Sequence, residues 1–376
     1  MILLLAALPA PALAADLTEE AVDTRAWEEL LQELDRDYAA SGEGLSLSEL
    51  WRQQLDPGGG GSQGLLSQVW SWLGATLWGQ LRANVGLLGQ VLALSVLSLL
   101  LSLLADSLAG AESARLASWV VSLLLLALAV SVFSQCLTMA RSGVDTVSDV
   151  LFVLLPLLMP LLAALGGIST VALISPALLF CLNILMQVLK NVVFPLIWCC
   201  ALLRLCSQLA PGFKVKGLAS LCQDAALGLL GVTSTLFVAF LSLSGLSAAG
   251  RDGLAVKAAK TASSAFIPVV GRTLADSLDS VLGTVLLLKG AVGLTGSLAL
   301  LLVCGLPALS ILVRALLFRL AGALVEPLGQ NDLAQALSGM GRSLTLLFAA
   351  LAVAGLFAYF ALALTVALGA VTMMMR

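Results

Sequence analysis

Histidine is absent from this sequence, and only 11% of its 376 residues are charged. Without histidine, H-E-x-x-H metalloprotease chemistry, serine–histidine pairs and histidine proton relays are excluded. There is also no G-x-x-x-x-G-K-[ST] segment, so the chain hydrolyses no nucleotide through a P-loop. Ordinary soluble domains carry roughly 25% charged residues, whereas 60% of this chain is apolar. The shortage of charge predicts an integral membrane protein.

Cysteine supplies no metal or redox motif. The seven cysteines include no C-x-x-C pair, and the first is Cys136. Because they fall in or beside apolar segments, we interpret them as small buried hydrophobic residues. We find no nucleophile beside a base and no metal-ligand cluster. The sequence therefore predicts a protein that is not an enzyme, without metal or cofactor, and we expect no nucleic-acid partner.

The remaining charge is unevenly distributed. Twelve of the 22 acidic residues lie between Asp16 and Asp56, whereas the chain after Asp56 has 16 basic and ten acidic residues. Residues 1–15 combine a short apolar run with Ala12-Leu13-Ala14, which is typical of a cleaved signal peptide; an uncleaved anchor is the alternative. Residues 16–64 are then an exported acidic helical region ending in a glycine-rich linker. We interpret this region as a small helical cap or a partner-docking element.

Long apolar runs dominate the rest of the chain. Three tryptophans in 65–82 predict an interfacial helix, followed by a polytopic all-α membrane domain over 83–376. With roughly 20 apolar residues needed per crossing, we expect about seven or eight transmembrane helices. The candidates are 85–105, 117–139, 170–189, 191–210, 225–248, 284–304, 307–325 and 343–368. Segment 150–167 contains Pro156 and Pro160, so we expect it to be broken or re-entrant.

An internal repeat is indicated over about 116–215 and 218–330, as is common in transporters. Pro156 and Pro268 are 112 residues apart, and so are Pro195 and Pro307. Chance similarity among leucine-rich helices is the alternative. The repeat would make 261–283 the counterpart of 150–167, as a second broken segment.

Charged residues in the apolar part are the candidate site. Arg272, Asp276 and Asp279 share one helical face, which suits a water-filled path or a partner; an amphipathic interfacial helix is the alternative. Lys257 and Lys260 suit anionic lipids, with an anionic substrate as the alternative. Three further charged residues lie within apolar runs: Arg204, Lys289 and Arg314. Charged side chains in such runs usually face a cavity or pair with an acidic residue. For Arg204, a side chain that extends to the membrane surface is the alternative.

Four short segments form a distinctive combination: Phe266 to Arg272 (FIPVVGR), Lys289 to Gly296 (KGAVGLTG), Glu326 to Gly329 (EPLG) and Met373 to Arg376 (MMMR). Together they resemble the stage III sporulation protein AE family of endospore-forming bacteria. The resemblance implies a polytopic protein of the mother-cell membrane around the forespore, with no catalytic residues to carry over. It also implies a multiprotein complex with a separate ATPase and a forespore-side channel protein, needed for late forespore gene expression.

The resemblance further implies an export-gate or permease-like subunit of that complex. Segments 150–167 and 261–283 would line its path. Two alternatives stay open: an autonomous secondary transporter, and a membrane scaffold that only anchors partners.

Overall fold

The computed structural model describes residues 25–39, 46–55, 63–107, 112–164, 168–209, 216–264, 271–328 and 331–374. Apart from Ser46 these residues are helical, which confirms the expected all-α class. The helices are α2 (Arg25–Ala39), α3 (Leu47–Leu55), α4 (Gln63–Ser107), α5 (Glu112–Ala164), α6 (Ile168–Val188), the π segment η2 (Leu189–Val193), α7 (Phe194–Leu209), α8 (Lys216–Ser264), α9 (Gly271–Val325), η3 (Glu326–Leu328) and α10 (Asn331–Met374). The predicted signal peptide lies outside the described residues.

Within the described residues, six helices are long and apolar enough to cross a membrane, fewer than the seven or eight expected. Two pairs of expected spans have merged, because each pair lies on one continuous helix: 170–189 with 191–210 on α6 to α7, and 284–304 with 307–325 on α9. Helix α5 joins the expected span 117–139 to residues 150–164 of the segment expected to be broken. The apolar run of α5 covers 44 residues. At 1.5 Å per residue it is about 66 Å long, roughly twice the hydrocarbon thickness of a bilayer. Such a helix cannot lie wholly within one hydrocarbon layer.

Helix α5 continues through Pro156 and Pro160 without a break. The expectation of a broken or re-entrant segment is therefore wrong for residues 150–164. A proline removes one backbone hydrogen bond, and surrounding packing can hold the helix together; Leu154, Leu155 and Leu158 are almost completely buried here. Segment 261–283 is instead divided between the end of α8 and the start of α9. Likewise, 65–82 is the first part of α4 rather than a separate helix.

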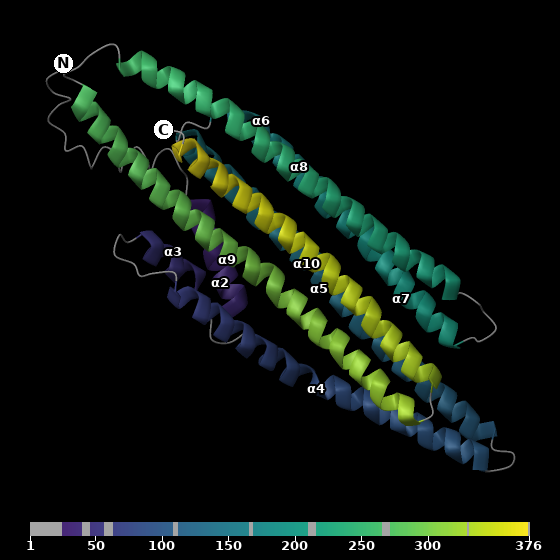
Figure 1. The fold of residues 1–376 in the computed structure, drawn as a ribbon. Coiled ribbons are helices and arrows are strands. Elements are labelled where there is room, and N and C mark those ends of the chain that lie inside the picture. The colour runs from purple at the N-terminus through teal and green to yellow at the C-terminus, as the bar shows by residue number, and fades with distance from the viewer. Residues whose placement is uncertain are drawn as a thin grey trace.

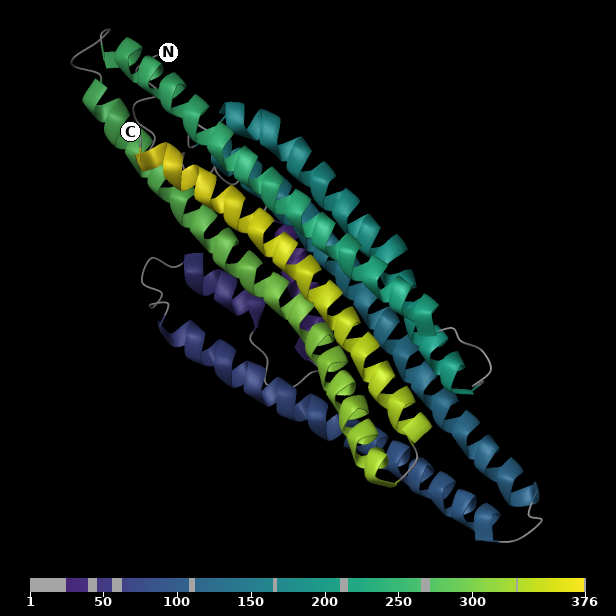
Figure 2. The ribbon, with the colours of Figure 1, turned by 45° about the vertical axis from the view of Figure 1, so that its right-hand side comes forward.

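The long helices lie side by side, each antiparallel to the next (Figures 1 and 2). Helix α10 is central, because it contacts α9 most extensively and also touches α5, α7 and α8. Each predicted repeat unit corresponds to one antiparallel pair, α5 with α6 to α7 and α8 with α9. Both pairs begin at the same end of the bundle (Figure 1). The repeat itself stays a prediction.

The acidic N-terminal region forms a helical pair docked on the bundle, since α3 and α2 both contact α9. Trp27 and Leu31 of α2 are completely buried. The Asp35 carboxylate accepts hydrogen bonds from the backbone N–H groups of Leu47 and Ser48, at 2.7 and 2.9 Å. A carboxylate that binds the free N–H groups at a helix start caps that helix, so Asp35 ties α2 to α3.

Glycine allows the backbones of α9 and α10 to approach closely. A Cβ built on Gly341 would lie 2.9 Å from the Ala315 carbonyl oxygen, and one on Gly322 would lie 3.0 Å from the Ala334 carbonyl oxygen. Backbone atoms cannot rotate away as a side chain can. These two glycines therefore set the spacing of the α9–α10 pair.

We expect Gly341→Ala and Gly322→Ala each to lower the free energy of unfolding by about 1–3 kcal/mol, because the added methyl overpacks the contact. Denaturation of the purified protein in mixed detergents, followed by circular dichroism, measures this. Gly305→Ala is the matched control on α9, since a Cβ there meets nothing within 4 Å and alanine has the higher helix propensity. Equal stability of the Gly341→Ala and Gly305→Ala variants would contradict the assignment.

Candidate functional site on helix α5

A strip of exposed polar side chains runs along one face of α5. At 100° per residue its members fall within one third of the helix circumference: Ser131, Ser134, Gln135, Thr138, Arg141, Ser142, Asp145 and Asp149. The opposite face is completely buried, with Phe133, Cys136 and Ala140 at 0% exposure. From the first member to the last the strip is about 27 Å long, close to the roughly 30 Å hydrocarbon thickness of a bilayer.

The first half of this polar strip lines an open groove, to which Trp198 of α7 and Arg314 of α9 also contribute. The Arg314 Nε donates a hydrogen bond to the Asn84 Oδ1 on α4 at 3.1 Å. One terminal nitrogen lies 3.3 Å from the Met139 sulfur, which is a weak acceptor. Among the described residues no carboxylate pairs with Arg314. Its positive charge is therefore free to act on whatever occupies the groove.

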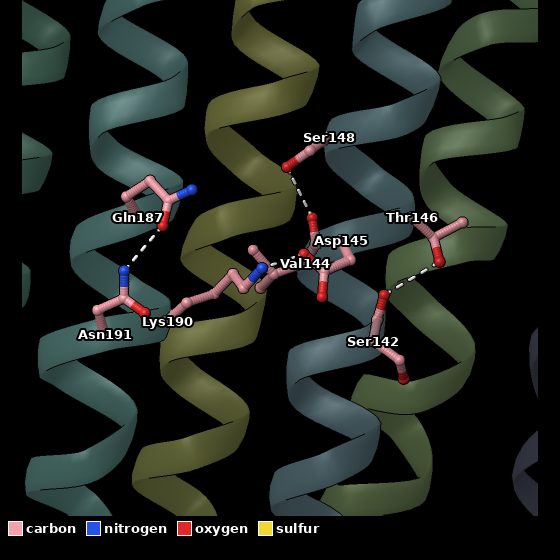
Figure 3. A network of polar contacts seen from close by, with 8 residues as sticks. All are labelled: Ser142, Val144, Asp145, Thr146, Ser148, Gln187, Lys190 and Asn191. Carbon is pink, nitrogen blue, oxygen red and sulfur yellow. Dashed lines mark hydrogen bonds and ion pairs between the residues drawn. The ribbon is translucent and has the colours of Figure 1, made fainter.

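The second half of the polar strip contains an ion pair between helices. Lys190 extends from η2 to the Asp145 carboxylate on α5 (Figure 3). The Lys190 side chain is 26% exposed and the Asp145 side chain 53%. Solvent screening weakens the attraction between partly exposed charges. The pair therefore contributes little to the free energy of unfolding, and its main effect is to hold η2 beside α5.

Lys190 lies in the π segment Leu189–Val193, between α6 and α7. A π turn holds about one more residue than an α turn, and single π turns inside α-helices are frequent at functional sites. Leu189 and Val193 are both completely buried, while Lys190 between them reaches α5. Asn191 donates a hydrogen bond to the Gln187 Oε1 at 2.8 Å (Figure 3). The wide turn thus places polar groups beside α5 within an otherwise apolar helix.

A cavity of about 190 Å³ lies between α5 and α6, next to the ion pair. Its polar lining comes from Asp145, Ser148, Asp149, Asn183, Gln187 and Lys190, and its apolar lining from Leu151, Phe152, Leu179, Leu182 and Met186. Groove and cavity together offer charges and hydrogen-bonding groups to a polar solute. Within the described part of the chain, no three histidine, cysteine or acidic residues are placed to hold a metal ion.

Five residues predicted as site members lie at one end of the bundle. Arg272, Asp276 and Asp279 are in the first turns of α9, and Lys257 and Lys260 are near the end of α8. Their side chains lie outside the described residues. The water-filled path or lipid contact predicted for them stays a prediction.

The other predicted residues are dispersed, and of these only Arg314 lines the groove. Arg204 of α7 donates a hydrogen bond to Gln223 of α8. Lys289 of α9 is 4% exposed, and none of the described side chains bonds to its ammonium. Neither Arg204 nor Lys289 reaches the Asp145–Lys190 pair.

Sequence reasoning missed Asp145, Asp149 and Lys190, because it assigned them to connections between spans. A signal was present: Arg141, Asp145 and Asp149 are spaced by four residues, and Thr138 and Ser142 extend the same spacing. This spacing marks one face of a continuous helix. The pattern was overlooked because apolar segments flank these residues on both sides, so the residues between them were interpreted as a loop.

Comparison with known proteins gives two matches. The family model described as stage III sporulation protein AE matches residues 49–369. The protein named stage III sporulation protein AE of Bacillus subtilis (strain 168) is 31% identical over 378 residues, covering 96% of this chain and 93% of that protein. No solved structure matches this chain.

We expect Asp145→Asn to lower the free energy of unfolding by about 1 kcal/mol or less, as for partly exposed ion pairs. The same substitution in a Lys190→Met background is expected to have a smaller effect, since the partner is already absent. Unfolding of the four proteins in mixed detergents gives the coupling energy. Asp149→Asn is the control, because its carboxylate has no partner among the described residues. The pairing would be refuted if Asp145→Asn and Lys190→Met were simply additive.

Proposed function

The chain belongs to the stage III sporulation protein AE family, and on that premise we propose that it is a membrane-embedded subunit of a multiprotein channel or secretion complex. Membership of the family gives the protein a role in sporulation. Six long apolar helices fit a membrane protein. The proposal adds that the subunit is permease-like and contributes a wet path to an export gate.

The polar strip on α5 is the observation that supports this proposal. Lipid tails cannot hydrogen-bond to serine, threonine or amide groups, and charged groups at that depth cost several kcal/mol. At membrane depth, the strip must therefore face water or another protein. It is exposed on the outer side of α5, so a second chain would have to complete the path.

The outward position of the polar strip favours a complex subunit over an autonomous transporter. Secondary transporters bind their substrates between repeats of one chain, near the middle of the membrane. Here the polar groups open away from the bundle centre, which α10 occupies. The arrangement also argues against a chain whose membrane part is only a scaffold, because a membrane anchor needs no polar strip about 27 Å long.

We propose further that the complex lies in the mother-cell membrane around the forespore. Its other members would be stage III sporulation proteins, including a separate ATPase and a forespore-side channel protein. Lys257 and Lys260 would bind anionic lipid headgroups at their end of the bundle. The chain itself would perform no catalysis.

Thiol labelling tests the wet strip directly. In a variant without the seven native cysteines, Thr138→Cys is expected to react with a membrane-impermeant maleimide in the assembled complex. Val192→Cys is the control: it is an exposed apolar position beside Lys190 on the facing helix and is expected to stay unlabelled in lipid. Equal labelling of the two positions would contradict a polar path along α5.

Sporulation tests the role of the same strip. We expect replacement of Ser134, Thr138 and Ser142 by leucine to reduce heat-resistant spores to near the count of a strain lacking the gene, because the path loses its hydrogen-bonding wall. The matched control replaces three exposed hydroxyl residues of α8 by leucine: Ser220, Thr235 and Ser242. It is expected to sporulate normally. Normal spore counts with the α5 variant would favour the scaffold, and transport by the purified protein alone in liposomes would favour the autonomous transporter.

A further inference from the structure

We propose that the cavity between α5 and α6 binds a primary ammonium group attached to a small apolar body. The proposal goes beyond a role in export, because such binding requires no other subunit. It rests on three features of the cavity: its charge, its unused hydrogen-bond acceptors and its apolar floor.

The charge of the cavity favours a monovalent cation. Asp145, Asp149 and Lys190 all line it, which gives a surplus of one negative charge. The ion pair with Lys190 engages Asp145, whereas the Asp149 carboxylate has no hydrogen-bond or ion-pair partner among the described residues. Asp149 is one helical turn beyond Asp145, on the same polar strip. It therefore remains available to a positively charged ligand.

The acceptor groups match an ammonium better than a metal ion. Asn183 lines the cavity, and its amide is likewise unpartnered among the described residues. The Gln187 Oε1 accepts one bond from Asn191 and keeps a second lone pair. Carboxylate and two amide oxygens together offer three acceptors, the number that a primary ammonium's three N–H donors require. Calcium needs six to eight oxygen ligands, more than these three side chains supply.

The apolar part of the lining includes three firmly packed side chains. Leu151, Leu182 and Met186 are exposed by only 3%, 4% and 4%, so they form a fixed floor. Phe152 is 50% exposed beside them. The volume of about 190 Å³ is far above the roughly 10–15 Å³ that one water needs. It is sufficient for a short branched hydrocarbon body attached to the ammonium.

Two sources could supply this chemistry: a free organic amine, and the headgroup of an ethanolamine phospholipid. Both present a primary ammonium next to carbon. Three lining residues, Asp149, Phe152 and Asn183, are themselves exposed at the surface of the bundle, which is the side from which either ligand would enter. The experiment therefore contains an arm for each source.

The full-length protein is purified into phosphatidylcholine nanodiscs, and binding of radiolabelled isopentylamine is measured by equilibrium dialysis. Saturable binding is expected for the unmodified protein. Asp149→Asn is expected to weaken it by roughly tenfold or more, the usual cost of losing a hydrogen bond to a charged group. Asp224→Asn removes an exposed carboxylate of α8 away from the cavity and is expected to bind as the unmodified protein does. Isopentyl alcohol, with the same body and no charge, is expected not to compete.

Replacing part of the phosphatidylcholine by phosphatidylethanolamine separates the two sources. A lower apparent affinity for isopentylamine identifies the lipid headgroup as a ligand, and an unchanged affinity identifies a free amine; both outcomes support the site. Asn183→Leu is a second variant, for use if Asp149→Asn fails to fold, and is expected to weaken binding too. The absence of saturable binding by the unmodified protein overturns the proposal, as does unchanged affinity in a folded Asp149→Asn variant. Thiol labelling at position 138 is independent of this result, so the site and the export role can fail separately.

Discussion

The contact of the buried face of α5 with α9 and α10 is the interaction on which the rest of the arrangement depends. At Gly143 a Cβ would lie 3.2 Å from Pro307 of α9 and 3.4 Å from Leu351 of α10, so α5 approaches both helices closely. Phe133, Cys136 and Ala140 on the same side of α5 are completely buried, so the rotation of α5 about its axis is fixed. The polar residues on the opposite face of α5 therefore point away from the bundle.

The same contact determines where the charges of neighbouring helices can go. The Arg314 side chain extends from α9 between α4 and α5, where it donates a hydrogen bond to the Asn84 amide oxygen rather than to a carboxylate. Lys190 reaches Asp145 from the π segment of the α6 to α7 helix. Charged groups therefore collect along the α5 face, although they come from three different helices.

A polar strip that extends from residue 131 to residue 149, about 27 Å along the helix, is costly on the outside of an apolar bundle if the protein is surrounded by lipid alone. It is explained when a second protein or a column of water covers it. This reasoning connects the physical chemistry of α5 to a family whose members serve sporulation. The docked α2–α3 pair adds a charged surface outside the apolar helices, with its tryptophan and leucine side chains turned inward.

The sequence by itself determined the class of this protein. An apolar content of 60% in long runs already indicates an all-helical membrane protein, and the absence of histidine excludes catalysis by histidine. Family membership was also readable from short segments. The number of long helices was not readable from the sequence, because Lys190 and Pro307 each separate two apolar runs of spanning length, as a loop would. Only the tertiary structure shows that both residues lie within continuous helices. It also shows that Arg141 and Asp145 share the exposed face of α5, whose opposite face is buried. It also decided which polar residues meet, since Asp145 and Lys190 are 45 residues apart and only the antiparallel packing of α5 and α6 brings them together.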